Sequence, residues 1–199
     1  MLSQAEILQF WFGDRPDDLQ VIDEKSSLWW AKDKAIDEEI KIRFDMSLES
    51  LIAGTLAYWK ETPGGWLAMI ILADQFSRNI HRGHPASYAQ DPIAQSLCQE
   101  GLEKKIDLQL RPIERVFLYM PLQHAESMEL QRQSVELFEK LLIPMSGQSR
   151  KKFNGYLEFA VRHYDIIARF GRFPHRNRVL GRQSTQEEME FLQRPGSSF

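Results

Sequence analysis

The feature that most constrains this chain is an unbroken apolar run over residues 66–73, directly after a helix-start signal. Thr62 is a suitable N-cap and Pro63 fits the first turn of a helix, so the run is expected to be helical. A helix that is apolar on every side must be surrounded by other elements. At eight residues the run is far too short to span a bilayer. The sequence therefore predicts a helix buried at the centre of a helical protein.

The rest of the chain shows the same helical punctuation. N-caps, first-turn prolines and apolar residues at helical spacing recur along its whole length. No stretch alternates for long with period two, and no Asn-Gly or Asp-Gly hairpin turn occurs. The expected helices begin near residues 3, 33, 62, 91, 112, 128, 149 and 184. We therefore expect an all-α fold, a compact array of about eight or nine antiparallel helices in a single domain over residues 1–199.

Three local signals predict specific helix boundaries. Asp91 is expected to cap the helix that follows it. Pro121 lacks a backbone donor and is expected to kink or break the helix that begins near residue 112. Ser184 and Glu187 have the spacing of a capping box, which predicts the start of the last helix.

Composition excludes several classes of protein. The net charge of −3 argues against nucleic-acid binding, which usually requires a basic face. The single cysteine, Cys98, cannot form an internal disulfide, which fits a reducing compartment. The N-terminus has no basic leader, so a cytoplasmic protein without a membrane partner is expected. His81 and His84 have no acidic or thiol ligand beside them, and nucleotide-binding glycine motifs are missing. No metal and no cofactor are expected.

The first candidate site is the loop over residues 169–182, which is rich in arginine and contains no acidic residue. Guanidinium groups form planar forks that suit phosphate and carboxylate, and an asparagine amide adds further donors. The alternative is that these arginines cap helix ends and pair with acidic residues of neighbouring helices. The candidate ligand-binding residues here are Arg172, His175, Arg176, Asn177 and Arg182.

The second candidate region follows the apolar helix. Arg78 stands four residues after Asp74, the spacing of an ion pair on one helix face, and Asn79 adds an amide. Polar residues attached to a buried helix can reach an interior cavity. A structural pair that closes the helix end is the alternative.

The third region lies around and after Pro121. His124 and Glu126 follow the expected kink and are candidates for the wall of a site. Arg115, in a mostly apolar helix, must find a carboxylate or an anion if it is buried. His163 lies at the edge of the apolar stripe of the long helix, either as a pocket-lining base or as a core histidine bonded to a backbone carbonyl or water.

Four stretches together resemble an uncharacterised bacterial family, domain of unknown function 924. The resemblance covers nearly the whole chain and implies an all-helical, tetratricopeptide-like superhelical fold, without an established activity. In the family pattern, proline is usual where this chain has Ser77, and Glu-His-Ser-Glu is usual at residues 123–126, so the retained His124 and Glu126 are better candidates than their neighbours. The stretches are ILQFWFGD (7–14), DQFSRNIHRG (74–83), ERVFLYMPLQHAE (114–126) and RFGRFPHRNRVLGRQSTQEEMEFL (169–192).

The leading hypothesis is a pocket for a small anionic ligand, formed where these regions converge. If the protein is an enzyme, hydrolysis or transfer on a phosphorylated or carboxylated substrate is expected, with His124, Glu126 and His163 as the catalytic candidates. The rival hypothesis is a helical scaffold that binds a protein partner and uses the polar residues as a structural network. The ligand-binding candidates are Asp74, Arg78, Asn79, Arg115, Arg172, His175, Arg176, Asn177 and Arg182.

Overall fold

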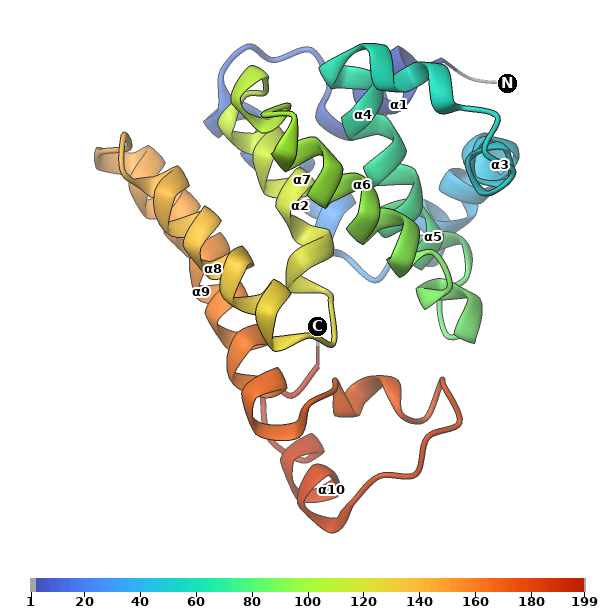
Figure 1. Ribbon diagram of the computed structural model, residues 1–199, viewed down its shortest axis with the longest axis vertical. Helices are drawn as coiled ribbons and strands as arrows, with labels where there is room; N and C mark the ends of the chain where they lie inside the picture. The colour runs from blue at the N-terminus through green and yellow to red at the C-terminus, as the bar shows by residue number, and fades with distance from the viewer. Residues whose placement is uncertain (1–2, 199) are drawn as a thin grey trace.

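A computed structural model describes residues 3–198, and every regular element in this range is a helix (Figure 1). The all-α prediction is confirmed. The tetratricopeptide-like arrangement and the single domain stay predictions. The α-helices are α1 Gln4–Phe12, α2 Asp18–Trp30, α3 Lys34–Ile52, α4 Pro63–Ile70, α5 Ser77–Ile80, α6 Asp91–Glu103, α7 Pro112–Gln123, α8 Met128–Leu142, α9 Gly147–Phe170 and α10 Gln186–Leu192. The shorter turns are η1 Ala57–Glu61, η2 Ile71–Phe76, η3 Pro85–Tyr88, η4 Asp107–Gln109 and η5 Pro174–Arg176.

The apolar run forms the central helix, as predicted. Thr62 caps it through a hydrogen bond from the Gly65 amide, and α4, η2 and α5 continue one another without a break. The helix packs against α1, α3, α6 and α7, which bury the whole apolar run. Its middle part, η2, is a π-helical turn, a wider turn that is rare and frequent at functional sites. This turn carries Asp74 and Gln75, two polar residues within the most buried part of the molecule.

The helix α2 is a finding that sequence analysis missed. Its apolar residues are few, so its period is weak, but Asp17 caps it and Trp29 fixes it to the core. The indole of Trp29 donates to the carbonyl of Trp11 at 3.0 Å, and both rings lie close to Phe117. Tertiary packing therefore holds a helix that its own pattern does not predict. Trp30, its last residue, stays about half exposed.

Two of the three boundary predictions were wrong by one residue. Asp91 is the first residue of α6 rather than its cap, because its carboxylate binds arginines instead of helix amides. The capping box of α10 uses Thr185 and Glu188 rather than the residues one position earlier. The hydroxyl of Ser184 instead accepts a hydrogen bond from the Asn177 amide.

Of the kink or break expected at Pro121, the break does not occur, since α7 continues through it to Gln123. All residues from Val116 to Gln123 are buried, and this packing outweighs the lost hydrogen bond. The helix nevertheless ends soon after, with His124 as its C-cap residue. The position of His124 therefore follows from where α7 stops.

The C-terminal part of the chain returns to the end of α7. In Figure 1, α8 and α9 form an antiparallel pair beside α7, and the segment after α9 turns back beneath it. A small second core of Ile166, Ile167 and Phe173, with Phe170 and Phe191 against it, fixes this segment. Residues 173–182 thereby reach the loop between α7 and α8. Within the described residues, no helix is both long enough and apolar enough to cross a membrane.

Candidate functional site

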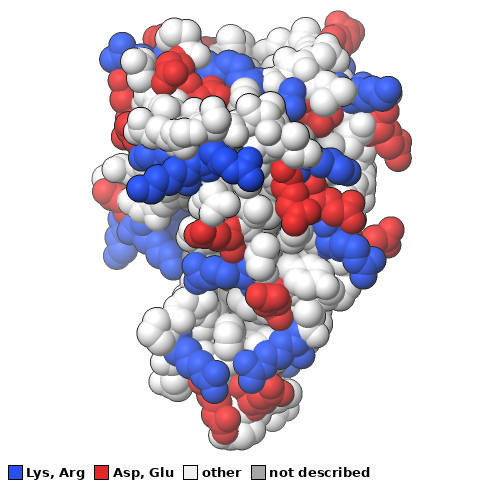
Figure 2. All heavy atoms as spheres, turned by 90° about the vertical axis from the view of Figure 1, so that its left-hand side faces the viewer, with Lys and Arg blue, Asp and Glu red and all other residues white. Residues whose placement is uncertain are grey.

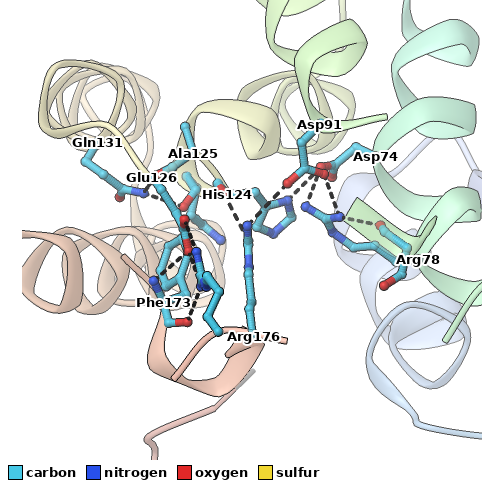
Figure 3. A network of polar contacts seen from close by, with 12 residues as sticks. Asp74, Arg78, Asp91, His124, Ala125, Glu126, Gln131, Phe173 and Arg176 are labelled. Carbon is cyan, nitrogen blue, oxygen red and sulfur yellow. Dashed lines mark hydrogen bonds and ion pairs between the residues drawn. The ribbon is translucent and has the colours of Figure 1, made fainter. Parts of the chain in front are cut away.

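The centre of the candidate site is a contact between His124 and Asp74. The Nδ1 atom of His124 lies 2.7 Å from Oδ1 of Asp74 (Figure 3). Because the carboxylate accepts, Nδ1 must carry a hydrogen, which leaves Nε2 as the second functional nitrogen of the ring. In the part of the chain that the structure describes, Nε2 makes no hydrogen bond. The pair therefore orients an imidazole whose outer nitrogen is unused by the protein.

Asp74 is ionised although it is fully buried. Burial raises the pKa of its carboxyl group. The charges of His124 and Arg78 and the hydrogen bonds from His124 and Gln75 together lower this pKa by more than burial raises it. The resulting pKa is well below the usual range of an aspartate. A charged carboxylate at this depth is held by its partners, and the π-helical turn places it among them.

Two arginines and a second aspartate extend this contact into a charged network. Arg78 lies 3.3 Å from Asp74 and 2.8 Å from Asp91. Arg176 approaches Asp91 at 3.3 Å and donates to the His124 carbonyl at 3.0 Å. Figure 3 shows these side chains pointing toward one another from separate helices and loops. We call Asp74, Arg78, Asp91, His124 and Arg176 the central network.

Arg176 is the most enclosed arginine of this network. Its guanidinium carbon lies 4.6 Å from the ring centre of Tyr88 and 4.4 Å from that of Phe173. Burial, together with the positive charge of Arg78, lowers its pKa to about 10, so it stays charged at neutral pH. Its Nε has no hydrogen-bond partner among the described residues. One donor of a buried guanidinium is therefore left for another molecule, such as water or a ligand.

A second network joins the end of α7 to the C-terminal segment. Glu126 accepts two hydrogen bonds from Arg182, at 2.6 and 2.9 Å, and one from the Phe173 amide at 2.8 Å. Burial raises the pKa of Glu126, but these hydrogen bonds and the charge of Arg182 bring it below its usual value. Asn177 accepts from Arg182 and donates to Glu188, which also binds Arg172. We call Glu126, Arg172, Asn177, Arg182 and Glu188 the C-terminal network.

An open pocket of about 310 Å³ lies where the two networks meet. His124, Glu126 and Arg176 line it together with Tyr88 and Leu180. This volume suits a small molecule. The pocket thus brings a predicted catalytic histidine, His124, together with Arg176 and with Glu126 from the loop between α7 and α8.

Of the two remaining predicted histidines, His163 is buried and His175 is half-buried. His163 donates from Nδ1 to the Phe159 carbonyl at 2.7 Å, the arrangement expected of a core histidine, and its ring centre lies 5.9 Å from that of His124. Burial and the neighbouring His124 lower its pKa well below the ordinary value. Burial and the charge of Arg176 lower the pKa of His175 to about 3. Both rings are therefore neutral near pH 7.

Two further predicted residues, besides His163 and His175, lie outside both networks. Asn79 donates to Asp37 of α3 at 2.8 Å and so joins two helices. Arg115 was expected to need an acid or an anion if buried; it is only half-buried and donates to the backbone carbonyls of Leu110 and Leu108. It lies in the first turn region of α7, whereas His124 lies at the other end of that helix. The structure therefore does not bring Asn79 and Arg115 to the pocket.

Sequence analysis missed three residues that complete the site. Asp91 was assigned to a helix cap, and nothing in its local sequence shows that it bridges Arg78 and Arg176. No sequence pattern gave a signal for Tyr88. Glu188 had an indirect one, since a capping box was expected one residue away.

Figure 2 shows acidic and basic side chains interspersed over the face that carries α8 and α9, without a continuous basic stripe on that face. Among the described residues, no group of three or more His, Cys, Asp or Glu side chains is arranged to hold a metal ion.

Comparison with known proteins gives a family and one similar structure. A family model described as a bacterial protein of unknown function (DUF924) matches residues 7–196. A solved structure of a protein of unknown function, ATU0120 from Agrobacterium tumefaciens, is 35% identical, covers 96% of each chain and superposes with a TM-score of 0.79. No curated protein matches the sequence.

Proposed function

We propose that this chain, which belongs to the DUF924 family of bacterial proteins of unknown function, binds a small phosphate- or carboxylate-bearing anion in the pocket beside His124. The observation that supports this most is the contact between His124 and the buried Asp74 at the pocket wall. A carboxylate that holds one ring nitrogen fixes the orientation of the ring, so that the other nitrogen is ready to bind a ligand.

The surroundings of His124 support an anion rather than a cation. Arg176 lines the same pocket and has a donor without a protein partner. The carboxylates in the wall are already covered, because Asp91 binds Arg78 and Glu126 binds Arg182. Their repulsion of an anion is thereby reduced. An oxyanion would find a guanidinium donor and an imidazole at the wall of one pocket.

Only one of the three catalytic candidates is placed to act on a bound ligand. Glu126 is engaged by Arg182 and by the Phe173 amide, and His163 is buried behind His124. If the anion is a substrate, His124 is the group that would accept or donate a proton. Asp74 would then be a positioning residue, because it would act through the histidine.

A second function, as a helical scaffold for a protein partner, is favoured by a different observation. Arg172, Arg176 and Arg182 are each paired with an acidic residue of the same chain. Such pairs hold the C-terminal segment against α7 whether or not a ligand binds. In this scheme the networks are structural, and the pocket has no ligand of its own.

A thermal-shift screen separates these functions. The probes are phosphate, sulfate, nucleotides, sugar phosphates and small carboxylates. A ligand at 100 times its Kd should raise the free energy of unfolding by about 2.7 kcal/mol, which is easily seen as a raised Tm. The scaffold function predicts no shift with any of these probes.

A pocket-filling variant shows whether a shift comes from this pocket. Leu180 lines the pocket and takes no part in the polar networks, so Leu180→Trp should fill the space and abolish the shift. Leu108→Trp is the matched control, because Leu108 is 61% exposed in η4 and lies outside the pocket. A shift that survives Leu180→Trp would place the ligand elsewhere and refute the proposed site.

A further inference from the structure

The charged side chains around His124 balance one another when its ring is neutral. Each carboxylate of the two networks that lies near the pocket is paired with a guanidinium, and three negative charges meet three positive ones. The pair formed by Arg172 and Glu188 is balanced in itself. The groups counted are the carboxylates of Asp74, Asp91 and Glu126 and the guanidiniums of Arg78, Arg176 and Arg182.

The other polar groups near the ring add no charge at neutral pH. His163 of α9 and His175 of η5 are neutral, because burial and neighbouring positive charges depress their pKa values. Tyr88 of η3 contributes a phenol, and Gln75 of η2 a neutral amide. The charge of Lys32 also contributes to the low pKa of His175, but Lys32 is exposed and does not line the pocket, so it is not counted here.

A balanced site of this kind has no net positive charge with which to attract an anion. Its arginines would have to leave their carboxylates to bind a ligand fully, which would leave those carboxylates buried and unpaired. Nε2 of His124 is different, since it makes no hydrogen bond in the described chain and His124 lines the pocket. Protonation there adds one positive charge and one donor. It leaves the Nδ1 contact with Asp74 intact.

We propose that anion binding in this pocket is coupled to the uptake of one proton by Nε2 of His124, so that the imidazolium supplies the charge that the arginines cannot. The inference rests on the proposed function and adds the protonation state in which the site binds its ligand. The bound species is an oxyanion that accepts a hydrogen bond from the imidazolium, beside Arg176 in the same pocket wall.

The coupling predicts the direction of the pH dependence. A bound anion stabilises the protonated ring, so affinity rises as pH falls and weakens as pH rises. One linked proton changes the affinity by up to about tenfold per pH unit. The affinity is therefore compared over a range of about pH 5 to 8.

Calorimetric titration with sulfate and with formate tests this directly. Neither anion takes up a proton itself in this range, so any proton that is bound enters the protein. Titrations in two buffers of different ionisation enthalpy give the number of protons taken up, which should approach one on the native protein. His124→Gln should abolish both the proton uptake and the pH dependence. His81→Gln is the matched control, because His81 ends α5 and does not line the pocket.

The outcomes separate the inference from the function on which it rests. If sulfate or formate binds with the same heat in both buffers and with an affinity independent of pH, the coupling is wrong and anion binding stands. If neither anion binds the native protein at any pH, the proposed anion site fails and the coupling fails with it. If His124→Gln does not fold, the comparison of buffers on the native protein still shows whether a proton is taken up when the anion binds.

Discussion

Arg176 connects the C-terminal segment to the rest of the protein, and its removal should be costly. Its guanidinium lies between the rings of Tyr88 and Phe173, faces Asp91 at 3.3 Å and donates to the His124 carbonyl at 3.0 Å. The substitution Arg176→Ala removes all four contacts at once. It also leaves Asp91, which is 9% exposed, with a single arginine partner.

The size of the expected stability loss depends on the partners that Asp91 keeps after the substitution. Removing one partner of a buried ion pair typically costs about 3–5 kcal/mol, because an uncompensated charge is left behind. Here Arg78 stays 2.8 Å from Asp91 and compensates part of that charge. We therefore expect the lower end of the range, a loss of about 3 kcal/mol in the free energy of unfolding. Such a loss lowers the ratio of folded to unfolded protein by roughly a hundredfold.

Urea unfolding, followed by tryptophan fluorescence, measures this loss. Arg169→Ala is the matched control, because Arg169 forms an ion pair with Glu187 in which the two side chains are 42% and 59% exposed. An exposed pair contributes only about 0–1 kcal/mol. If Arg176→Ala is no more destabilising than Arg169→Ala, the central network does not hold the C-terminal segment and the reasoning above is wrong. Arg176→Met, which keeps an apolar side chain beside the rings, should recover part of the loss.

Three further predictions concern other parts of the fold. Burial raises the pKa of Asp74 but the adjacent positive charges lower it below the ordinary value, so its stabilisation is present above about pH 4 and is lost as pH falls further. The destabilisation by Asp74→Asn, measured in urea, should therefore shrink toward acid pH, and a constant difference would contradict this. A Cβ on Gly65 would lie 2.2 Å from the Trp59 carbonyl oxygen, so Gly65→Ala should lower the Tm sharply, whereas Gly155→Ala, with no atom near its added carbon, should raise stability by about 0.5–1 kcal/mol. Burial raises the pKa of the Cys98 thiol, which should react with a disulfide reagent only after unfolding, and fast reaction of the native protein would show that the core opens.

The sequence alone determined the fold class and most helices, because these depend on local rules. Caps, first-turn prolines and apolar periodicity act over a few residues, so the central helix and the long α9 could be placed from their own patterns. The helix α2 could not, since contacts of Trp29 with distant rings stabilise it. The continuation of α7 through Pro121 could not be predicted either, because burial of the whole segment overrides the tendency of proline to end a helix.

For the site, the sequence identified residue types and the tertiary structure chose among them. A run of arginines without acids predicted polar chemistry in the C-terminal loop, and the ion-pair spacing of Asp74 and Arg78 was correct. Whether an arginine meets a ligand, an acid or a carbonyl depends on what other helices bring to it. Arg115 and Arg176 have the same side chain, yet one binds backbone carbonyls and the other is enclosed by two rings.

The pairing of His124 with Asp74 was decided by tertiary structure. The two residues are 50 positions apart, on different helices, and their 2.7 Å contact depends on the π-helical turn at one and on the end of α7 at the other. Local periodicity contains no information about such a distance, because it reports which face of a helix is apolar and not which helices meet. The sequence thus determined a buried helical core with charged residues attached to it. Only the packing of that core set the charges against one another and left one imidazole nitrogen at the pocket.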